Sequence, residues 1–224
     1  MTDHSSRSDP SAGPSTALIA GLGCLVLAAF AVGIDAILKP ASASLTREGG
    51  ALELASAGFY FVAIATLVVR SGRPGLWQSA VILAAMGLRE LDADKRFTSE
   101  GILSTKIFVY DTPLWEKIVA AAVLGLLIFA IVTLLAKSWT ALRAGLRSGE
   151  RWTLYLAGAA VLTVVSKSID GLARKLAPYD ISISEGTSAT TGRIEEVLEL
   201  GIPILLIMTI LETARRSRPS RSAG

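Results

Sequence analysis

The chain has 224 residues, of which 51% are hydrophobic and only 18% are charged, and its mean hydropathy is +0.53. So much apolar sequence is unusual for a soluble domain of this size. The net charge of +3 does not indicate nucleic-acid binding, because the basic residues are scattered between apolar blocks and form no stripe with interleaved aromatic residues. The apolar blocks approach the roughly 20 residues that cross a bilayer, which predicts an all-α integral membrane bundle of about six transmembrane helices.

The histidine and cysteine content limits metal and redox chemistry. The only histidine, His4, lies in a polar N-terminal segment, and the only cysteine, Cys24, lies in an apolar block. One cysteine cannot form an intrachain disulfide or a cysteine-rich metal site, and the lack of further histidines nearly excludes a histidine-ligated metal or haem. We therefore expect no cofactor and no metal site, with a divalent cation held by carboxylates as the one alternative.

The chain order predicts one transmembrane domain between two polar tails. Residues 1–15 are rich in Ser, Pro and Gly and are expected to form a disordered cytoplasmic tail, and the apolar block that follows is too long for a signal peptide. Residues 16–214 are expected to form the transmembrane domain, and residues 215–224 a basic cytoplasmic tail. The six predicted spans are residues 16–38, 51–69, 76–92, 114–136, 152–172 and 193–211.

The span predicted for residues 76–92 is the weakest of the six. Only 13 residues, Leu76 to Leu88, precede the charged pair Arg89 and Glu90, which is short of a full crossing. Either this pair lies inside the outer membrane boundary or the segment is re-entrant. We favour a full crossing, because Trp77 can anchor one interface and the charged end can snorkel to the other.

The basic residues indicate the orientation. Lys and Arg are shared almost equally between the two sides, but on the side of the termini they cluster in the connector after the fourth span and in the tail after the sixth. Basic residues next to spans favour the cytoplasmic side, so we expect both termini in the cytoplasm.

The acidic residues point to the other, non-cytoplasmic side, because only four of the 19 lie on the side of the termini. Each predicted span brings at least one ionisable group to that level. The candidates for a ligand or ion pocket are Glu53, Glu90, Lys167, Asp170 and Glu199, and the secondary candidates are Asp35, Arg89, Glu195 and Glu196. No residue is assigned a catalytic role.

The spacing of these residues along their helices, and the free-energy cost of burying their charges, refine this prediction. Glu195 and Glu199 are four residues apart and Lys167 and Asp170 are three apart, so each pair shares a helix face. Charges near the apolar core are costly unless they pair, so we expect Lys167 to be the central cation, held by Asp170 or by an acid from another helix. The alternative is that these groups are interfacial helix-end charges, since acids at a helix start also suit the helix dipole.

Three segments carry a resemblance to known sequences. Arg47 to Ser56 (REGGALELAS), Gly87 to Thr98 (GLRELDADKRFT) and Arg193 to Pro203 (RIEEVLELGIP) resemble motifs in uncharacterised multi-pass inner-membrane proteins of bacteria. The likeness covers about 33 residues and is a pattern of acids around helix ends. It implies a location in the bacterial cell inner membrane and no known activity. Alkaline ceramidase-type membrane hydrolases also place acids at one membrane face, but this chain lacks the histidines of their zinc site.

Three functions fit these features. The first is the binding or transport of a cation, a proton or a small cationic ligand in the acidic pocket. The second is an enzyme acting on a lipid or isoprenoid substrate through paired carboxylates, which is less favoured because no GxSxG, HExxH, P-loop or CxxC motif supports a named reaction. The third is an accessory or sensor subunit that docks through the polar loops 93–113 and 173–192. The lipid bilayer is the one partner predicted, and the sequence assigns no oligomeric state.

Overall fold

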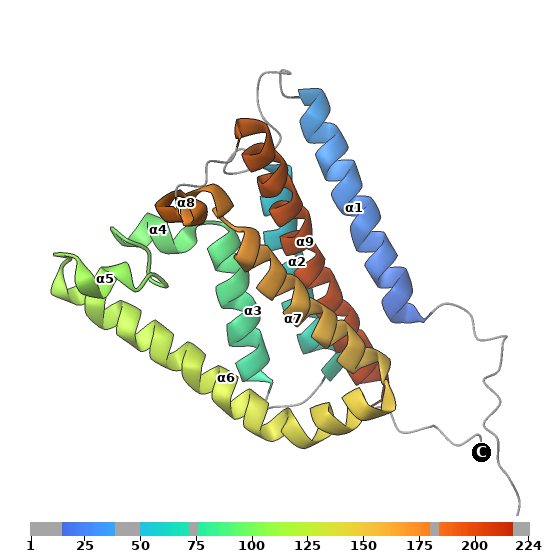
Figure 1. Cartoon of the computed structure of the whole chain (residues 1–224). Helices are drawn as coiled ribbons and strands as arrows, with labels where there is room; N and C mark the ends of the chain where they lie inside the picture. Colours follow the sequence, from blue (N-terminus) through green and yellow to red (C-terminus); the bar gives the residue numbers. More distant parts are fainter. Residues whose placement is uncertain (1–14, 39–49, 72–75, 180–183, 217–224) are drawn as a thin grey trace, which may run out of the picture.

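The computed structural model describes residues 15–38, 50–71, 76–179 and 184–216, and this part of the chain contains helices and connecting turns but no strand. The predicted tails lie outside the described residues, apart from Ser15, Arg215 and Arg216. The six long helices are α1 (Thr16–Leu38), α2 (Ala51–Ser71), α3 (Trp77–Glu90), α6 (Leu114–Ser148), α7 (Arg151–Ile169) and α9 (Glu185–Arg216) (Figure 1). The short helices are α4 (Ala93–Phe97), α5 (Lys106–Val109) and α8 (Leu172–Leu176), which is followed by the 3-10 turn η1 (Ala177–Tyr179).

Five of the long helices, α1, α2, α6, α7 and α9, are long and apolar enough to cross a membrane. The protein is therefore an all-α membrane bundle. Helix α3 is not one of the five, because its 14 residues extend only about 21 Å, against a hydrocarbon core of roughly 30 Å. A crossing by α3 stays a prediction.

Helix α3 connects two long helices that run in the same direction. Successive long helices alternate in direction in Figure 1, and α2 and α6 run the same way, so α3 returns the chain between them. Helix α1 begins and α9 ends at one end of the bundle, which we call the termini end. Helix α3 ends and α9 begins at the other end, close to α4 and α8, and we call this the distal end.

Two helices extend well beyond the predicted spans. Helix α6 continues past residue 136 to Ser148, where Gly149, with φ +67°, closes its C-terminus in the left-handed conformation that suits glycine. Helix α9 begins at Glu185, inside the predicted loop 173–192. The Ser184 hydroxyl accepts a hydrogen bond from the Thr187 amide at its start, as an N-cap does.

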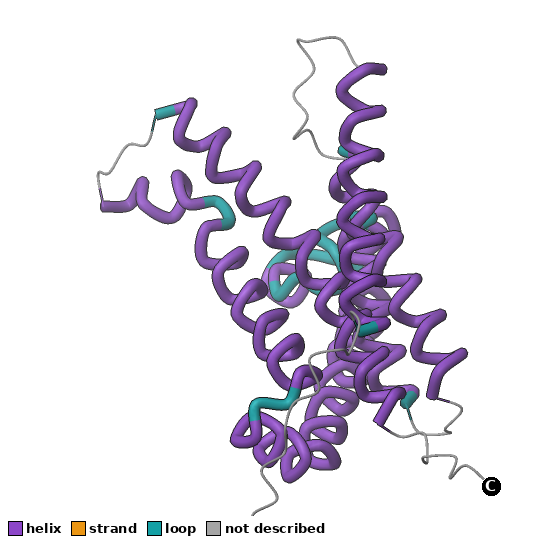
Figure 2. The backbone as a smooth tube through the Cα atoms, turned by 90° about the vertical axis from the view of Figure 1, so that its right-hand side faces the viewer, coloured by secondary structure: helices purple, strands orange, loops and turns teal. Residues whose placement is uncertain are grey.

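The core forms where α9 packs against α7, α2 and α1, and α3 fills the space between α2 and α6. Tyr60, Ala63 and Leu83 belong to the same buried apolar cluster as Ile207 and Met208. Figure 2 shows the long helices joined by short turns, and Figure 1 places α6 at the edge of the bundle. Helix α6 exposes many apolar residues along its length, as contact with lipid requires. It meets α3 through Phe129, whose ring stacks on Trp77 with 6.0 Å between the ring centroids.

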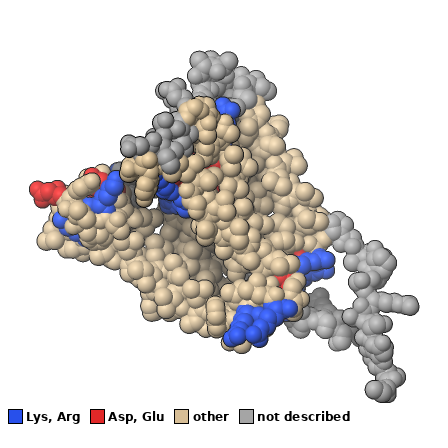
Figure 3. Space-filling view, in the orientation of Figure 1, with Lys and Arg blue, Asp and Glu red and all other residues tan. Residues whose placement is uncertain are grey.

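The charged side chains follow this architecture. On the face shown in Figure 3 they gather towards the two ends of the bundle, and uncharged residues cover the band between them. This separation suits a bundle whose middle lies in hydrocarbon.

Candidate functional site

Lys167, in the last turn of α7 at the distal end, lies among three carboxylates. Its Nζ is 2.6 Å from Glu199 Oε1, 3.7 Å from Asp170 Oδ2 and 3.8 Å from Glu195 Oε1. Glu195 and Glu199 are one turn apart on α9, whereas Asp170 ends α7 as its C-cap. The Glu195 and Glu199 side chains are 18% and 19% exposed, so this cluster is only partly open to solvent.

Close packing of α7 on α9 positions these groups. The two helices run antiparallel, which brings the last turn of α7 next to the part of α9 that carries the acids. Glycines allow the approach: a Cβ at Gly201 would lie 2.8 Å from Leu162 Cδ1, and one at Gly158 would lie 3.3 Å from Leu205 Cδ1. The small residues therefore fix the separation at which Lys167 reaches α9.

Helix α3 contributes a fourth carboxylate. Glu90, its last residue, interacts electrostatically with Glu199 and Lys167, and also with its neighbour Arg89, whose side chain is exposed. The cluster thus receives ionisable groups from α3, α7 and α9.

Helix α2 adds two polar side chains that the sequence did not single out. The Ser56 hydroxyl lies beside the Glu90 carboxylate, and Tyr60 interacts electrostatically with Glu90 and Glu199. Both are at most 2% exposed. Glu53, Ser56 and Tyr60 are spaced by three and four residues on one face of α2, and this spacing was the signal that could have identified them.

Glu53 and Glu196 lie beside the cluster and not on Lys167. Glu53 of α2 interacts electrostatically with Glu196 of α9, and Arg193 offsets the charge of Glu196. Among the described residues neither acid forms an ion pair with Lys167. Asp35 belongs to α1, but its side chain lies outside the described part of the structure.

Two acceptor groups near the cluster lack their usual partners. Pro203 lies inside α9, and because proline has no amide hydrogen it cannot donate to the carbonyl oxygen of Glu199 four residues earlier. Ser166 Oγ, next to Lys167, is fully buried and has no hydrogen-bond partner within the described residues. Both groups can accept a further donor at this end of the α7–α9 interface.

The arrangement is centred on the ammonium group of Lys167. Within the described ranges no group of three or more His, Cys, Asp or Glu side chains could hold a metal. The carboxylates of Asp170, Glu195 and Glu199 instead converge on Lys167 Nζ. Comparison of the chain with protein-family models, with curated proteins and with solved structures gave no match. The geometry of the cluster is therefore the basis for inferring a function.

Proposed function

We propose that this is a multi-pass protein of the bacterial inner membrane, with both termini in the cytoplasm, that binds a small cationic ligand at the distal carboxylate cluster. The observation that supports this function is the convergence of three carboxylates from two helices on one ammonium, that of Lys167. Glu90 adds a fourth carboxyl group within electrostatic range of Lys167. Acids therefore outnumber the cation at the centre of the cluster.

The distances indicate the chemistry of the ligand. Only Glu199 lies within hydrogen-bonding distance of Lys167 Nζ, whereas Asp170 and Glu195 are 3.7 and 3.8 Å away and retain acceptor capacity. The buried Ser166 hydroxyl is a further acceptor. A primary or secondary amine brings several N–H donors and a positive charge, which matches these acceptors better than a bare metal ion would.

A binding measurement on the purified full-length protein tests this proposal. Thermal unfolding is followed in detergent while ethylamine, spermidine, sodium and calcium are added separately at equal ionic strength. We expect the amines to raise the unfolding temperature and the inorganic ions to have less effect. Glu195→Gln should remove the response to amines, because it deletes one of the two less committed carboxylates and leaves the Lys167–Glu199 pair in place.

Glu116→Gln is the matched control. Glu116 is also a buried acid near the distal end, but it accepts hydrogen bonds from the amide and hydroxyl of Ser99 and does not contact the cluster. Equal responses of the wild type and of Glu195→Gln, or equal stabilisation by sodium and by the amines, would rule out the proposed site.

Cysteine labelling tests the orientation independently. With Cys24 replaced by alanine, single cysteines are placed at Thr105 or Ser184 near the distal end and at Ser148 at the end of α6, all of which are in accessible turns or helix ends. Gly145 is unsuitable, because a Cβ there would lie 2.5 Å from Thr153 Cγ2. We expect reagents outside intact cells to label positions 105 and 184 but not 148, and the opposite pattern would reverse the orientation.

A further inference from the structure

A second polar site lies at the termini end, far from the Lys167 cluster. A cavity of about 230 Å³ opens there between the first turn of α7 and the last turns of α9. It is lined by Glu150, Arg151, Trp152, Glu212 and Arg216. This volume lies below the roughly 300–1,000 Å³ of pockets for drug-sized ligands, so the cavity suits a small polar group.

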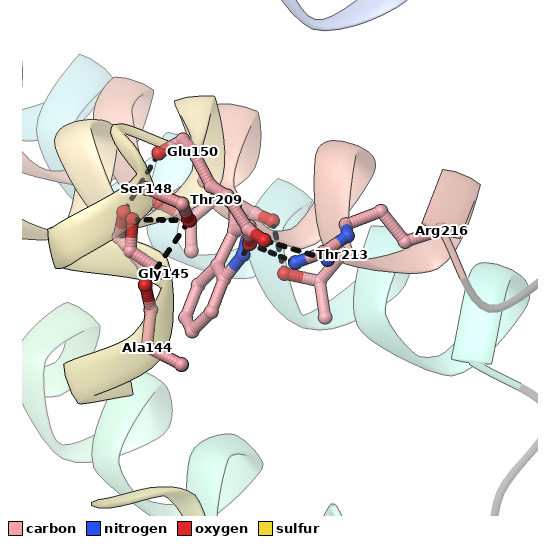
Figure 4. A network of polar contacts seen from close by, with 9 residues as sticks. Ala144, Gly145, Ser148, Glu150, Thr209, Thr213 and Arg216 are labelled. Carbon is pink, nitrogen blue, oxygen red and sulfur yellow. Dashed lines mark hydrogen bonds and ion pairs between the residues drawn. The ribbon is translucent and has the colours of Figure 1, made fainter. Parts of the chain in front are cut away.

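Two of the lining residues already satisfy each other. The Arg216 guanidinium donates through both terminal nitrogens to the Glu150 carboxylate, and the Trp152 indole Nε1 donates to the same carboxylate over 2.5 Å. Figure 4 shows Glu150 and Arg216 facing each other across the α7–α9 interface. This bidentate pair holds the end of α9 against the start of α7 and leaves Glu150 little capacity for a ligand.

Glu212, by contrast, has a carboxylate oxygen without a partner among the described residues. The residue is only 8% exposed, and its Oε1 atom is buried with no hydrogen-bond partner in the described part of the chain. Its position makes the negative charge more costly, because it lies in the last turns of α9, where the helix dipole is negative. A buried carboxylate at such a place is stabilised by a nearby cation, and Glu212 lines the cavity in which a cation can lie.

Arg151 supplies the opposite charge at the rim. It is exposed, and among the described residues it forms no ion pair. It begins α7, where the Thr153 and Leu154 amides donate to the Glu150 carbonyl oxygen, and its own amide and that of Trp152 precede the first intrahelical hydrogen bond. A helix start with an adjacent arginine favours a phosphate.

The surroundings indicate where such a ligand comes from. Trp152 and the basic residues Arg143, Arg147 and Arg215 lie at the same end of α6, α7 and α9. Tryptophan and basic residues at helix ends are typical of the membrane–water interface, where lipid headgroups lie. The cavity therefore lies at headgroup level.

We propose that this cavity binds a zwitterionic amine–phosphate group, as in an ethanolamine phospholipid headgroup, with the ammonium on Glu212 and the phosphate on Arg151. The primary ammonium gives Glu212 the hydrogen-bond donors that it lacks. A choline headgroup carries the same charges but has no N–H donor, and a glycerol headgroup has no cation. The cavity should distinguish the three headgroups for these reasons.

Native mass spectrometry of the delipidated full-length protein tests this proposal, with phosphatidylethanolamine, phosphatidylcholine or phosphatidylglycerol of identical acyl chains added back. We expect phosphatidylethanolamine to bind about tenfold more tightly than the other two, equivalent to about 1.4 kcal/mol. Glu212→Gln and Arg151→Gln should each remove this preference. Arg147→Gln, a basic residue near the same end that does not line the cavity, should keep it.

The remaining outcomes are also decisive. Soluble phosphoethanolamine that competes with the lipid would show that the headgroup is recognised, and failure to compete would assign the binding to the acyl chains and overturn the proposal. Equal binding of the three lipids, or an unchanged preference in both Glu212→Gln and Arg151→Gln, would also overturn it. Arg151 is exposed, so its variant remains informative if Glu212→Gln fails to fold.

Discussion

Replacing Lys167 with methionine probes the centre of the distal cluster. Methionine keeps most of the length of the side chain but removes the ammonium, which leaves the carboxylates of Asp170, Glu195 and Glu199 without their common cation. Removing one partner of a fully buried ion pair costs about 3–5 kcal/mol, whereas an exposed pair is worth about 0–1 kcal/mol. The Lys167 side chain is 35% exposed and that of Glu199 is 19% exposed, so the pair lies between these limits. We expect a loss of about 2 kcal/mol in the free energy of unfolding.

The assay is thermal unfolding in a neutral detergent at low ionic strength. A loss of about 2 kcal/mol lowers the unfolding temperature by about 4–8 °C in a chain of this size. Lys106→Met is the control, since Lys106 is an exposed residue of the short helix α5. Lys175 is a poor control, because its Nζ donates a hydrogen bond to the carbonyl oxygen of Lys167 over 2.8 Å.

A double variant separates charge from packing. If Lys167→Met destabilises by stranding Glu199, the further change Glu199→Gln should restore part of the loss, which gives a coupling energy above about 0.5 kcal/mol. An unfolding temperature of Lys167→Met equal to that of Lys106→Met would refute the assignment of Lys167 as the central cation. So would a double variant whose loss is the simple sum of the two single losses.

Three further predictions concern other polar and close contacts. Gly145→Ala should destabilise the protein by about 1–3 kcal/mol in thermal unfolding, because the new Cβ would lie 2.5 Å from Thr153 Cγ2. The Thr153 side chain is fully buried and β-branched, so it cannot easily move, and wild-type stability of the variant would contradict this prediction. Glu116→Ala should release the Ser99 amide, so its hydrogen exchange should become faster than in Glu116→Gln, which keeps an acceptor. Ser166→Ala should leave stability unchanged or raise it by about 1 kcal/mol, since the hydroxyl has no partner to lose among the described residues, and a clear loss of stability would show that it has one.

The helical bundle could be predicted from the sequence because apolar blocks of bilayer length have few structural alternatives in a membrane. Apolar blocks of bilayer length must form helices in lipid, where every backbone amide and carbonyl needs an internal partner. The pairing of Lys167 with Glu199 could be expected for a similar reason, since charges beside an apolar core are stable only in contact with opposite charges. Both predictions follow from the free-energy cost of exposing polar groups to hydrocarbon.

Helix ends were harder to predict, because hydropathy marks where a chain leaves the membrane and not where a helix stops. Helix α6 continues through the basic segment up to Gly149, the first residue at its end with a positive φ. Helix α9 starts in a polar segment of serines and threonines, where the Ser184 hydroxyl accepts a hydrogen bond from the Thr187 amide. Local capping set these boundaries, whereas the predicted ones followed hydropathy alone.

The sequence also did not determine which residues the acids at the distal end interact with. Spacing along one helix places Glu195 and Glu199 on a shared face, but it does not give the rotation of α2 relative to α9. In the structure Glu53 interacts electrostatically with Glu196, and Ser56 and Tyr60, one and two turns further along α2, interact with Glu90. The rotation follows from packing of Tyr60 in the core, which is a long-range contact with no signature in a single sequence.

The two polar sites lie on one helix pair, and their separation makes them independent. Lys167 pairs with Glu199 near the distal end of α7 and α9, and Glu150 pairs with Arg216 at the termini end. Glu150 and Lys167 are separated by 17 positions, or about 25 Å along α7, which exceeds the roughly 7–10 Å within which substitutions usually couple. Screening in physiological salt further limits any direct interaction over this distance. Variants of one site should therefore report on that site alone, so the amine-binding function and the headgroup site can each fail without affecting the evidence for the other.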